Sequence, residues 1–284
     1  MGIYQTLRKK MRGPAKTVLA VKRWKRISFD EAPVIFGNAK PKSGSHLLLQ
    51  ILNGFCQVMP YRYVEEEPVR TVNKDGGRRS SIEILTEIRN IQKGVIGWGY
   101  VDAVPENVDF LCKADRVNYF IYRDPRDLLI SHVFFATDMH EGHGMHDHYK
   151  RLTSFDERLK VAITGIDQNG LYMVNVRQRY EGVFQWLQQT GVLSIRFEDL
   201  INDRDTVLNA MLTQVEKTGY KIPTKREKAL EILQNTIQPG KSHTFRSGKT
   251  GEWKKYFKDE HKILFKEVAG DLLTRLEYEK NEDW

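Results

Sequence analysis

Residues 33–46 have the sequence PVIFGNAKPKSGSH, and this stretch decides the fold. Its first seven residues form a short apolar run that ends in small residues, which predicts a buried β-strand. The spacing of Leu, Ile and Phe in residues 46–59, HLLLQILNGFCQVM, predicts a helix directly after the loop KPKSGS. A strand, a tight loop and a helix in this order are typical of an α/β domain.

The alternation of strand and helix continues along the chain. Three further apolar runs predict buried strands, at residues 94–101, 117–122 and 192–197. The spacing of apolar residues predicts helices at residues 80–92, 125–135, 169–189 and 205–218. The sequence therefore predicts an α/β fold, with a single domain and a central parallel β-sheet flanked by helices.

Local signals refine two of these segments. Asp124 can cap the helix that follows residues 117–122, and Pro125 suits its first turn. Residues 65–79, EEEPVRTVNKDGGRR, are charged and rich in turn-forming residues. We expect an exposed, mobile loop there.

The composition limits the class of protein. A chain of 284 residues with 40% hydrophobic and 11% aromatic residues can bury a sizeable core. Its two cysteines, Cys56 and Cys112, are too few for a disulfide framework, which favours a reducing compartment. No stretch has the apolar length of a membrane span, and the first residues lack a secretory signal, so we predict a cytoplasmic protein.

The N-terminal segment is the most basic part of the chain. Residues 1–26 contain nine Lys or Arg and no Asp or Glu, interleaved with apolar residues. This pattern predicts a basic amphipathic arm that could contact a membrane peripherally, and MGIYQT fits an N-terminal acylation pattern. The alternative is an unmodified cationic tail or surface helix. We place the arm at residues 1–30 and the main domain at residues 31–284.

The loop after the first strand has the chemistry of an anion site. Lys42, Ser43, Gly44 and Ser45 place backbone N–H groups at a helix N-terminus, where a phosphate can bind. In a nucleoside triphosphate loop, Lys follows the second glycine, whereas here Lys42 precedes Gly44. This order argues against an ATP-dependent kinase.

Four short motifs in a fixed order resemble the cytosolic-type family of sulfotransferases that use 3'-phosphoadenosine-5'-phosphosulfate (PAPS). PKSGS at residues 41–45 is similar to the Pro-Lys-Ser-Gly-Thr motif, and YRDPRDLLISH at residues 122–132 is similar to the segment that grips the 3'-phosphate. RFEDL at residues 196–200 resembles Tyr-Glu-Asp-Leu, with Phe197 in place of tyrosine. FRSGKTGEWKKYF at residues 245–257 resembles Arg-Lys-Gly-x-x-Gly-Asp-Trp-Lys, with Ser247 and Glu252 in place of Lys and Asp.

The resemblance implies a P-loop-like fold, PAPS as donor, PAP as product and no metal. It assigns to Lys42 assistance of the leaving group, and to Arg123 and Ser131 the grip on the 3'-phosphate. A guanidinium suits that task because its planar fork pairs with phosphate oxygens. The full set of predicted donor-binding residues is Lys42, Ser43, Gly44, Ser45, His46, Arg123, Ser131, Arg246, Ser247 and Gly248.

The catalytic base is where the sequence departs from the family. The family's histidine would fall in GWGYV, at the position of Trp98 or Gly99. An acceptor hydroxyl still needs a proton acceptor, unless it is acidic enough to react without one. The alternatives are His46, which we name as a catalytic candidate, and His132, Asp102, Glu106 and the histidines at 140, 143, 146 and 148.

Two neighbouring features bear on the acceptor. The segment DMHEGHGMHDH at residues 138–148 could chelate a metal, but we favour a flexible loop on the acceptor side and predict no metal site. Trp98 could line the acceptor pocket, although a buried strand tryptophan is the commoner case. Leu47 lies near the position of the family's adenine-stacking tryptophan.

We therefore predict transfer of a sulfuryl group from PAPS to a hydroxyl or amine of a small-molecule or saccharide acceptor. The formal charge of +8 fits an anionic saccharide, and the chain fits an alcohol, a phenol or a lipid-borne sugar equally. We favour a carbohydrate or glycolipid and expect no nucleic acid partner. The alternatives are a catalytically silent PAP-binding or membrane-associated protein of the same fold and, less favoured, a P-loop kinase.

Overall fold

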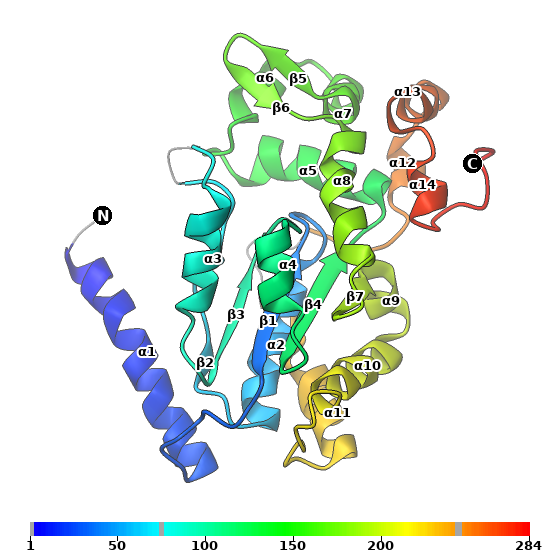
Figure 1. The fold of residues 1–284 in the computed structure, drawn as a ribbon. Coiled ribbons are helices and arrows are strands. Elements are labelled where there is room, and N and C mark those ends of the chain that lie inside the picture. Colours follow the sequence, from blue (N-terminus) through cyan, green and yellow to red (C-terminus); the bar gives the residue numbers. More distant parts are fainter. Residues whose placement is uncertain (1–2, 74–76, 242–245) are drawn as a thin grey trace.

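The computed structural model describes residues 3–73, 77–241 and 246–284, with side chains described from Gly13 onward. Its centre is a parallel five-stranded sheet in the order β2-β3-β1-β4-β7 (Figure 1). The strands are β1 (Val34–Ala39), β2 (Tyr63–Val64), β3 (Val95–Gly99), β4 (Arg116–Tyr122) and β7 (Val192–Arg196). The predicted single α/β domain with a parallel sheet is confirmed.

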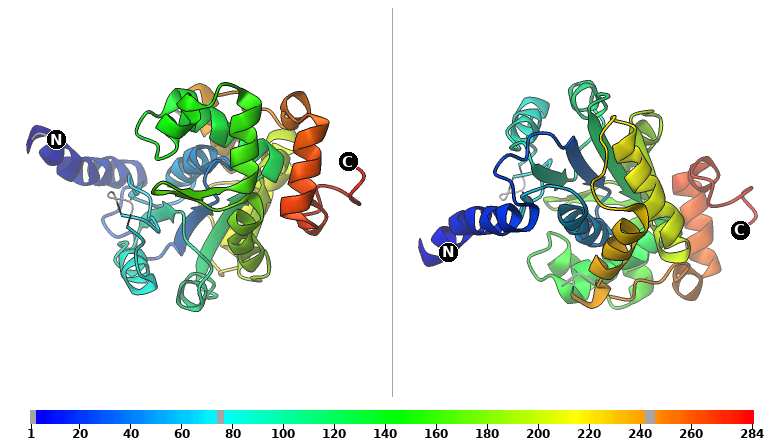
Figure 2. Two further views of the ribbon diagram at one scale, coloured as in Figure 1. Left: turned by 90° about the horizontal axis from the view of Figure 1, so that it is seen from above. Right: turned by 90° about the horizontal axis from the view of Figure 1, so that it is seen from below.

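Helices cover both faces of the sheet (Figures 1 and 2). On one face lie α2 (Ser45–Val58), α9 (Phe197–Asn202), α10 (Arg204–Glu216) and α11 (Arg226–Thr236). On the other lie α3 (Ser81–Arg89), α4 (Pro105–Leu111), α5 (Pro125–Phe134), α7 (Phe155–Thr164), α8 (Val176–Leu187), α12 (Trp253–Tyr256), α13 (Asp259–Ala269) and α14 (Leu272–Arg275). Two apolar cores result, one on each face.

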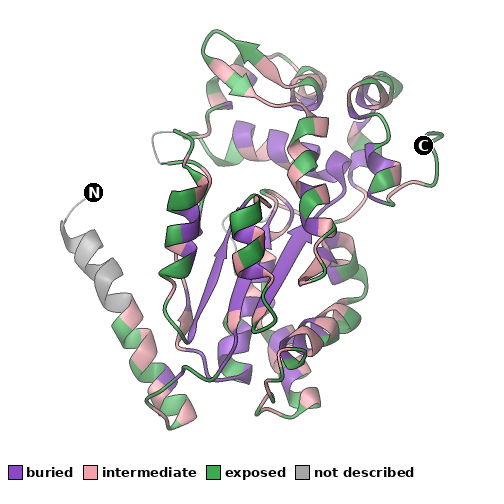
Figure 3. Cartoon of the chain, viewed as in Figure 1, coloured by how far each residue is buried: buried purple, intermediate pink, exposed green. Residues whose placement is uncertain are grey.

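Alternation along the strands builds these two cores. In β4, Tyr119 and Ile121 pack against α2 and α10, whereas Phe120 and Tyr122 face the opposite core. This follows from the two-residue period of a strand, which sends successive side chains to opposite faces. Figure 3 shows the result: the inner strands β3, β1 and β4 are buried along almost their whole length, the edge strand β7 is mostly half-buried, and exposed residues lie on the outer sides of the helices.

The predicted capping signals are present. Asp124 accepts a hydrogen bond from the backbone N–H of Arg126 at the start of α5, and Pro125 occupies the first turn. The helix then widens into a π-helical turn, Phe135–Met139, which leads to α6 (His146–Arg151). Turns of this π-helical kind are rare in proteins overall, and those that do occur are often found at functional sites.

The predicted helix at residues 169–189 is wrong in its first part. Strands β5 (Ile166–Gln168) and β6 (Leu171–Met173) form an antiparallel hairpin there, and α8 begins only at Val176. The turn uses Asn169 and Gly170 at φ of +52° and +75°. Asn and Gly adopt this left-handed conformation easily, so the turn overrides the apolar spacing that suggested a helix.

The predicted loop at residues 65–79 is also only partly exposed. Val69 is buried and forms a bridge with Gly99, where its N–H donates to the Trp98 carbonyl at 2.9 Å. The segment therefore continues the sheet edge for a short distance before it reaches the surface. Residues 74–76 lie outside the described residues.

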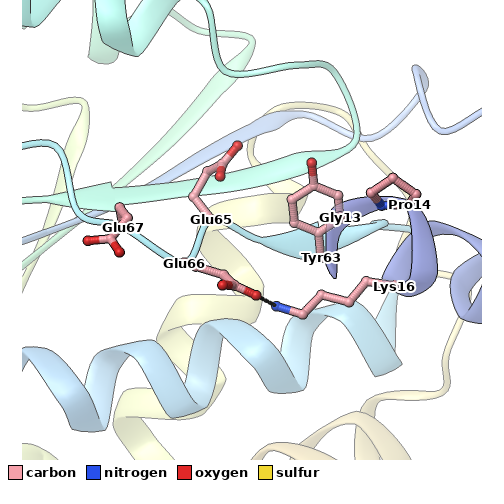
Figure 4. Close-up of a pocket in the computed structure, with 7 residues that line it drawn as sticks. All are labelled: Gly13, Pro14, Lys16, Tyr63, Glu65, Glu66 and Glu67. Carbon is pink, nitrogen blue, oxygen red and sulfur yellow. Dashed lines mark hydrogen bonds and ion pairs between the residues drawn. The ribbon is translucent and has the colours of Figure 1, made fainter. Parts of the chain in front are cut away.

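Helix α1 (Ile3–Trp24) lies beside the edge strand β2, and Figure 2 shows it extending from that side of the molecule. The Lys16 ammonium group forms a 2.8 Å ion pair with Glu66, and Gly13 packs against the Tyr63 ring (Figure 4). These contacts frame a shallow hollow of about 360 Å³ that also includes Glu65. Within the described residues, no helix combines the length and the apolar character needed to cross a membrane. The domain boundary at residue 30 stays a prediction.

Candidate active site

A cavity of about 770 Å³ opens at the carboxyl edge of the sheet. Loops from the ends of β1, β3, β4 and β7 all contribute to it, because parallel strands end at the same edge. Strand β1 lies between β3 and β4, so the loop after β1 lies centrally in this edge.

Nine of the ten predicted donor-binding residues line this cavity, and we call them the motif wall. They are Lys42, Gly44, Ser45, His46, Arg123, Ser131, Arg246, Ser247 and Gly248. The tenth, Ser43, is fully buried below the loop, and its Oγ has no partner among the described residues. The fold thus brings together three motifs that are far apart in the sequence.

The loop after β1 has an unusual backbone. Gly44 has a φ of +93°, and a Cβ atom there would lie 2.6 Å from the Phe197 ring. Lys42 has a φ of +70°, which is strained for a residue with a side chain. Glycine is therefore required at position 44 both by conformation and by contact.

Lys42 lies among other cations. Burial and the nearby charges of Arg123 and Arg246 lower the pKa of its ammonium group to about 8. Its Nζ lies 3.6 Å from the centroid of the Phe135 ring, the first residue of the π-helical turn. A bound anion would relieve the repulsion among these three cations.

Arg123 is held by the segment that carries the third motif. Its guanidinium donates to the Lys249 carbonyl at 2.7 Å and lies 3.5 Å from the Asp127 carboxylate. Asp127 in turn accepts backbone N–H bonds from Gly251 and Trp253 at 2.7 and 2.8 Å. Asp127 therefore fixes the 246–253 segment against α5, which accounts for an acid four residues after Arg123.

The two substitutions in the third motif contact each other. Glu252 accepts hydrogen bonds from Ser247 and Arg246, and the Arg246 guanidinium lies 4.6 Å from the centroid of the Phe134 ring. Burial tends to raise the pKa of Glu252, but the Ser247 hydrogen bond and the Arg246 charge outweigh it and lower the pKa. Glu252 is thus an anion that orients both side chains toward the cavity.

The fourth motif supports the other three. The Phe197 ring lies beneath Gly44, and the Arg123 guanidinium lies 4.5 Å from its centroid. Glu198 accepts from the backbone N–H of Asp124 at 3.1 Å and from the Tyr278 hydroxyl at 2.8 Å. Residues 196–200 therefore act mainly by positioning the loops around them.

A second set of lining residues, which we call the histidine wall, carries no family motif. Its members are Arg70, Thr71, Val72, Tyr100, Phe135, His140 and His143. The Tyr100 hydroxyl lies 3.1 Å from Ser45 Oγ, which joins this wall to the motif wall. Sequence reasoning identified the two histidines as candidates but missed the other five, although Tyr100 directly follows β3, a position where functional residues gather.

The other lining residues are Pro41, Leu47, Gln50, Phe197, Ile201, Arg204 and Pro239. Leu47 and Gln50 come from the first turns of α2, next to the motif wall. Arg204, at the start of α10, was not foreseen.

The candidates for a proton acceptor are dispersed. His46 lines the cavity at the start of α2, whereas Asp102 and Glu106 are exposed residues outside the lining. Trp98 is also absent from the lining: it is buried, and its indole N–H donates to the Glu65 carbonyl at 2.9 Å. The suggestion that Trp98 contacts the acceptor is therefore not supported.

Two histidines of the candidate set lie side by side. His132 is buried, its ring centroid is 5.2 Å from that of His143, and its Nε2 has no partner among the described residues. Burial, with the positive charge of Arg179 and the neighbouring His140, lowers the pKa of His143 to about 4. Of the residues in the described ranges, no group of three or more His, Cys, Asp and Glu could hold a metal ion.

The motif wall fits an anionic nucleotide. It offers the free hydroxyl of Ser43 beneath it, a glycine against which a larger side chain would clash, and Nε atoms of Arg123 and Arg246 that have no partner among the described residues.

A comparison with protein-family models matches residues 118–277, more than half of the chain, to the sulfotransferase domain. The chain belongs to the sulfotransferase domain family. The enzyme class predicted from the motifs, a PAPS-dependent sulfotransferase, is thereby confirmed. The matched residues include Arg123 and the third and fourth motifs, whereas Lys42 and its loop precede them.

Solved structures share the fold. Mouse sulfotransferase SULT7A1 complexed with PAP is 17% identical, with a TM-score of 0.58 over 88% of this chain and 91% of that chain. Retinol dehydratase in complex with retinol and PAP is 14% identical, with a TM-score of 0.54 over 89% of this chain and 86% of that chain. Among curated proteins, no relative matches this sequence.

Proposed function

We propose that this sulfotransferase binds PAPS on the motif wall and transfers its sulfuryl group to an acceptor on the histidine wall. The observation that carries the proposal is the convergence of Lys42, Arg123 and Arg246 on one cavity from three distant segments. The PAP-bound state of the structural neighbours supports the choice of nucleotide.

The reaction breaks the bond between sulfur and the bridging phosphate oxygen and forms a bond between sulfur and the acceptor oxygen or nitrogen. The electron pair of the broken bond stays on the phosphate of PAP, where negative charge develops. Lys42 stabilises this charge, and the backbone N–H groups of residues 43–45 hold the phosphate. Arg123, Ser131 and Arg246 to Gly248 hold the 3'-phosphate, and the preset contacts of Asp127 and Glu252 orient them.

The acceptor must lose a proton when its oxygen attacks sulfur. His46 is the motif-wall residue that we propose for this step, because it lines the cavity at the start of α2. His143 is less suited. Its Nδ1 accepts the Met145 N–H at 3.1 Å, so the neutral ring carries its proton on Nε2 and offers the cavity a donor.

We further propose a carbohydrate or glycolipid as the acceptor, and peripheral membrane contact through α1 in a cytoplasmic protein. The exposed Val18 and Leu19, with Lys22 and Arg23 nearby, support an anionic lipid surface as partner. Co-sedimentation with vesicles of phosphatidylserine, compared with phosphatidylcholine, tests this contact. Equal binding to both vesicles, or binding to neither, would count against it.

Calorimetric titration with PAP in the absence of magnesium tests the donor site. We expect Arg123→Ala to weaken PAP binding by about 30-fold or more, since truncating one partner of a buried charge pair costs about 2 kcal/mol or more. Lys42→Ala should instead lower turnover about 100-fold with a smaller loss of PAP affinity, because its charge acts mainly in the transition state. Arg177→Ala, which removes an exposed ion pair with Asp271, is the control.

The same measurements of PAP binding and turnover distinguish the proposed function from its alternative. A catalytically silent PAP-binding protein is favoured by one observation, the buried Trp98 where the family has its base. Such a protein would bind PAP, lose binding in Arg123→Ala and transfer no sulfuryl group to any acceptor tested. Small and equal effects of both substitutions would contradict the site assignment itself.

A further inference from the structure

The cavity lining is unbalanced in charge. It contains five cationic side chains, those of Lys42, Arg70, Arg123, Arg204 and Arg246, and no Asp or Glu. On the proposed function, the phosphate and sulfuryl groups of the donor occupy the three cations of the motif wall. Arg204 lies with Phe197 and Ile201 on the α9–α10 side of the cavity. Arg204 and Arg70 are therefore both left without an anion among the residues described, and of these two only Arg70 lies on the acceptor side.

Arg70 belongs to the histidine wall. Its guanidinium lies 5.8 Å from the centroid of the Tyr100 ring, and among the residues that the structure describes it has no carboxylate partner. Its neighbours in the loop differ in this respect, because Arg78 lies 3.7 Å from Asp102 and Arg79 lies 2.5 Å from Glu87. Arg70 alone of these three faces the cavity.

Two further cations lie near the histidine wall. Lys40 directly follows β1, and its ammonium group has no hydrogen bond or ion pair within the described ranges. Burial lowers its pKa to about 8, although the nearby Asp102 charge acts in the opposite direction. Arg179 donates from Nε to the Val174 carbonyl at 3.1 Å, while its Nη2 is buried without a partner in the described part of the chain. The Arg179 charge helps to lower the pKa values of His132 and His143, so its field reaches this wall.

His143 adds a donor, not an acceptor, to this wall. In the neutral ring of His143 the proton is on Nε2, since Nδ1 accepts the Met145 N–H. Arg70 is exposed at the cavity, whereas Lys40, Arg179 and His143 are half-buried. Cations and donors that are partly removed from water without a partner are stabilised when a bound group satisfies them. What would satisfy Arg70, Lys40, Arg179 and His143 together is negative charge.

We propose that the acceptor is itself an anion: a hydroxyl compound that carries a carboxylate, phosphate or sulfate group, which Arg70 binds. Lys40 and Arg179 strengthen the attraction by their field and need not touch the acceptor. This inference rests on the proposed sulfotransferase function and narrows its substrate class. The inference does not depend on the acceptor skeleton. The cations select the charged group, and the rings of Tyr100 and Phe135 contact the rest of the acceptor.

Matched pairs of probes test the proposal with the full chain saturated with PAP. One pair is 4-hydroxyphenylacetate and its neutral amide, and the other is methyl glucuronide and methyl glucoside. Calorimetry should give about tenfold to hundredfold tighter binding for the charged member of at least one pair, the range for a hydrogen bond to a charged group. Transfer from PAPS should favour the same member.

Arg70→Gln should abolish this preference without changing PAP affinity. Arg78→Gln is the matched control, because it removes an arginine from the same loop that lies outside the lining and pairs with Asp102. The control should keep both the preference and PAP binding. An equal loss in both variants would show that the loop, and not the Arg70 charge, is responsible, and would overturn the inference.

The outcomes distinguish a failure of this inference from a failure of the proposed sulfotransferase function on which it rests. If PAP binds but the charged probes bind no better than the neutral ones, or bind not at all at millimolar concentration, the anionic acceptor is wrong and the donor site stands. If PAP itself does not bind, the proposed function is wrong. The preference for charged probes is then measured without nucleotide, and its absence also overturns the charge assignment of the histidine wall.

Discussion

The motif wall and the histidine wall line the same cavity, but their cations are satisfied differently. In the motif wall, Arg123 has the Asp127 carboxylate and the Lys249 carbonyl, and Arg246 has Glu252. Near the histidine wall, Arg70 and Lys40 have no such partners among the residues described. The cations of one wall are therefore oriented by the protein itself, whereas those near the other have no such fixed partners.

This difference matches the tasks that we propose for the two walls, donor binding on one and acceptor binding on the other. Every reaction uses the same donor, so fixed contacts that orient its binding groups lower the cost of binding each time. The acceptor determines what the enzyme does, and its recognition can depend on charges that only the correct molecule neutralises. Three predictions test this division, beginning with the largest effect.

Gly44→Ala should abolish the fixed geometry of the motif wall. Its Cβ would lie 2.6 Å from the Phe197 ring at a φ of +93°, so we expect the loop to shift and turnover to fall about 100-fold. Gly219→Ala is the control, since Gly219 has a φ of +84° and no atom within 4 Å of the place where the alanine methyl group would lie. It should lose about 1 kcal/mol of stability and no activity. Equal kinetics for both variants would contradict a preset donor loop.

The pH dependence should reveal Lys42. Because its pKa is lowered to about 8, kcat/KM for PAPS should fall about tenfold per pH unit once the charge is lost above pH 8. Lys42→Arg should react more slowly but lose this alkaline fall, since a guanidinium stays charged. A rate that rises through pH 8 would show instead that deprotonation of Lys42 or of the acceptor helps the reaction.

Lys40→Met should have the smallest effect, and it should stabilise the protein, whereas the preceding substitutions impair it. Removing a half-buried cation that has no ion pair among the residues described should raise the free energy of unfolding by about 1 kcal/mol at pH 7. Because the pKa of Lys40 is lower in the folded state, the wild type should gain stability as pH rises from 8 toward 10.5, and the variant should not. Lys113→Met, on the surface, is the control, and destabilisation by Lys40→Met alone would contradict an unsatisfied cation.

Much of the motif wall could be predicted from the sequence. Lys42 and Gly44 lie in a loop whose strand and helix are set by local apolar spacing, and Asp124 caps its helix through a contact between near neighbours. Their positions depend on short-range geometry that the sequence pattern already contains. The carboxyl edge of a parallel sheet then brings such loops together.

The histidine wall could not be predicted in the same way. Arg70 and Tyr100 meet because Val69 pairs with the edge of β3, and Phe135 reaches Lys42 through a π-helical turn. These contacts depend on tertiary packing that no local pattern records. The hairpin at Asn169 and Gly170 is a different case, because its Asn-Gly turn signal is local and present in the sequence, where it overrides the helical spacing of the apolar residues.

The carboxylate of Asp127 has a consequence for how the protein is made. Its two N–H donors, Gly251 and Trp253, lie 124 and 126 residues further along the chain. Contacts of such separation form late, and a chain under synthesis exposes α5 long before those residues emerge. Until then the carboxylate lacks these two donors, so nucleotide binding should appear only after residues 246–253 have been translated, and PAP binding would report that this segment has been made.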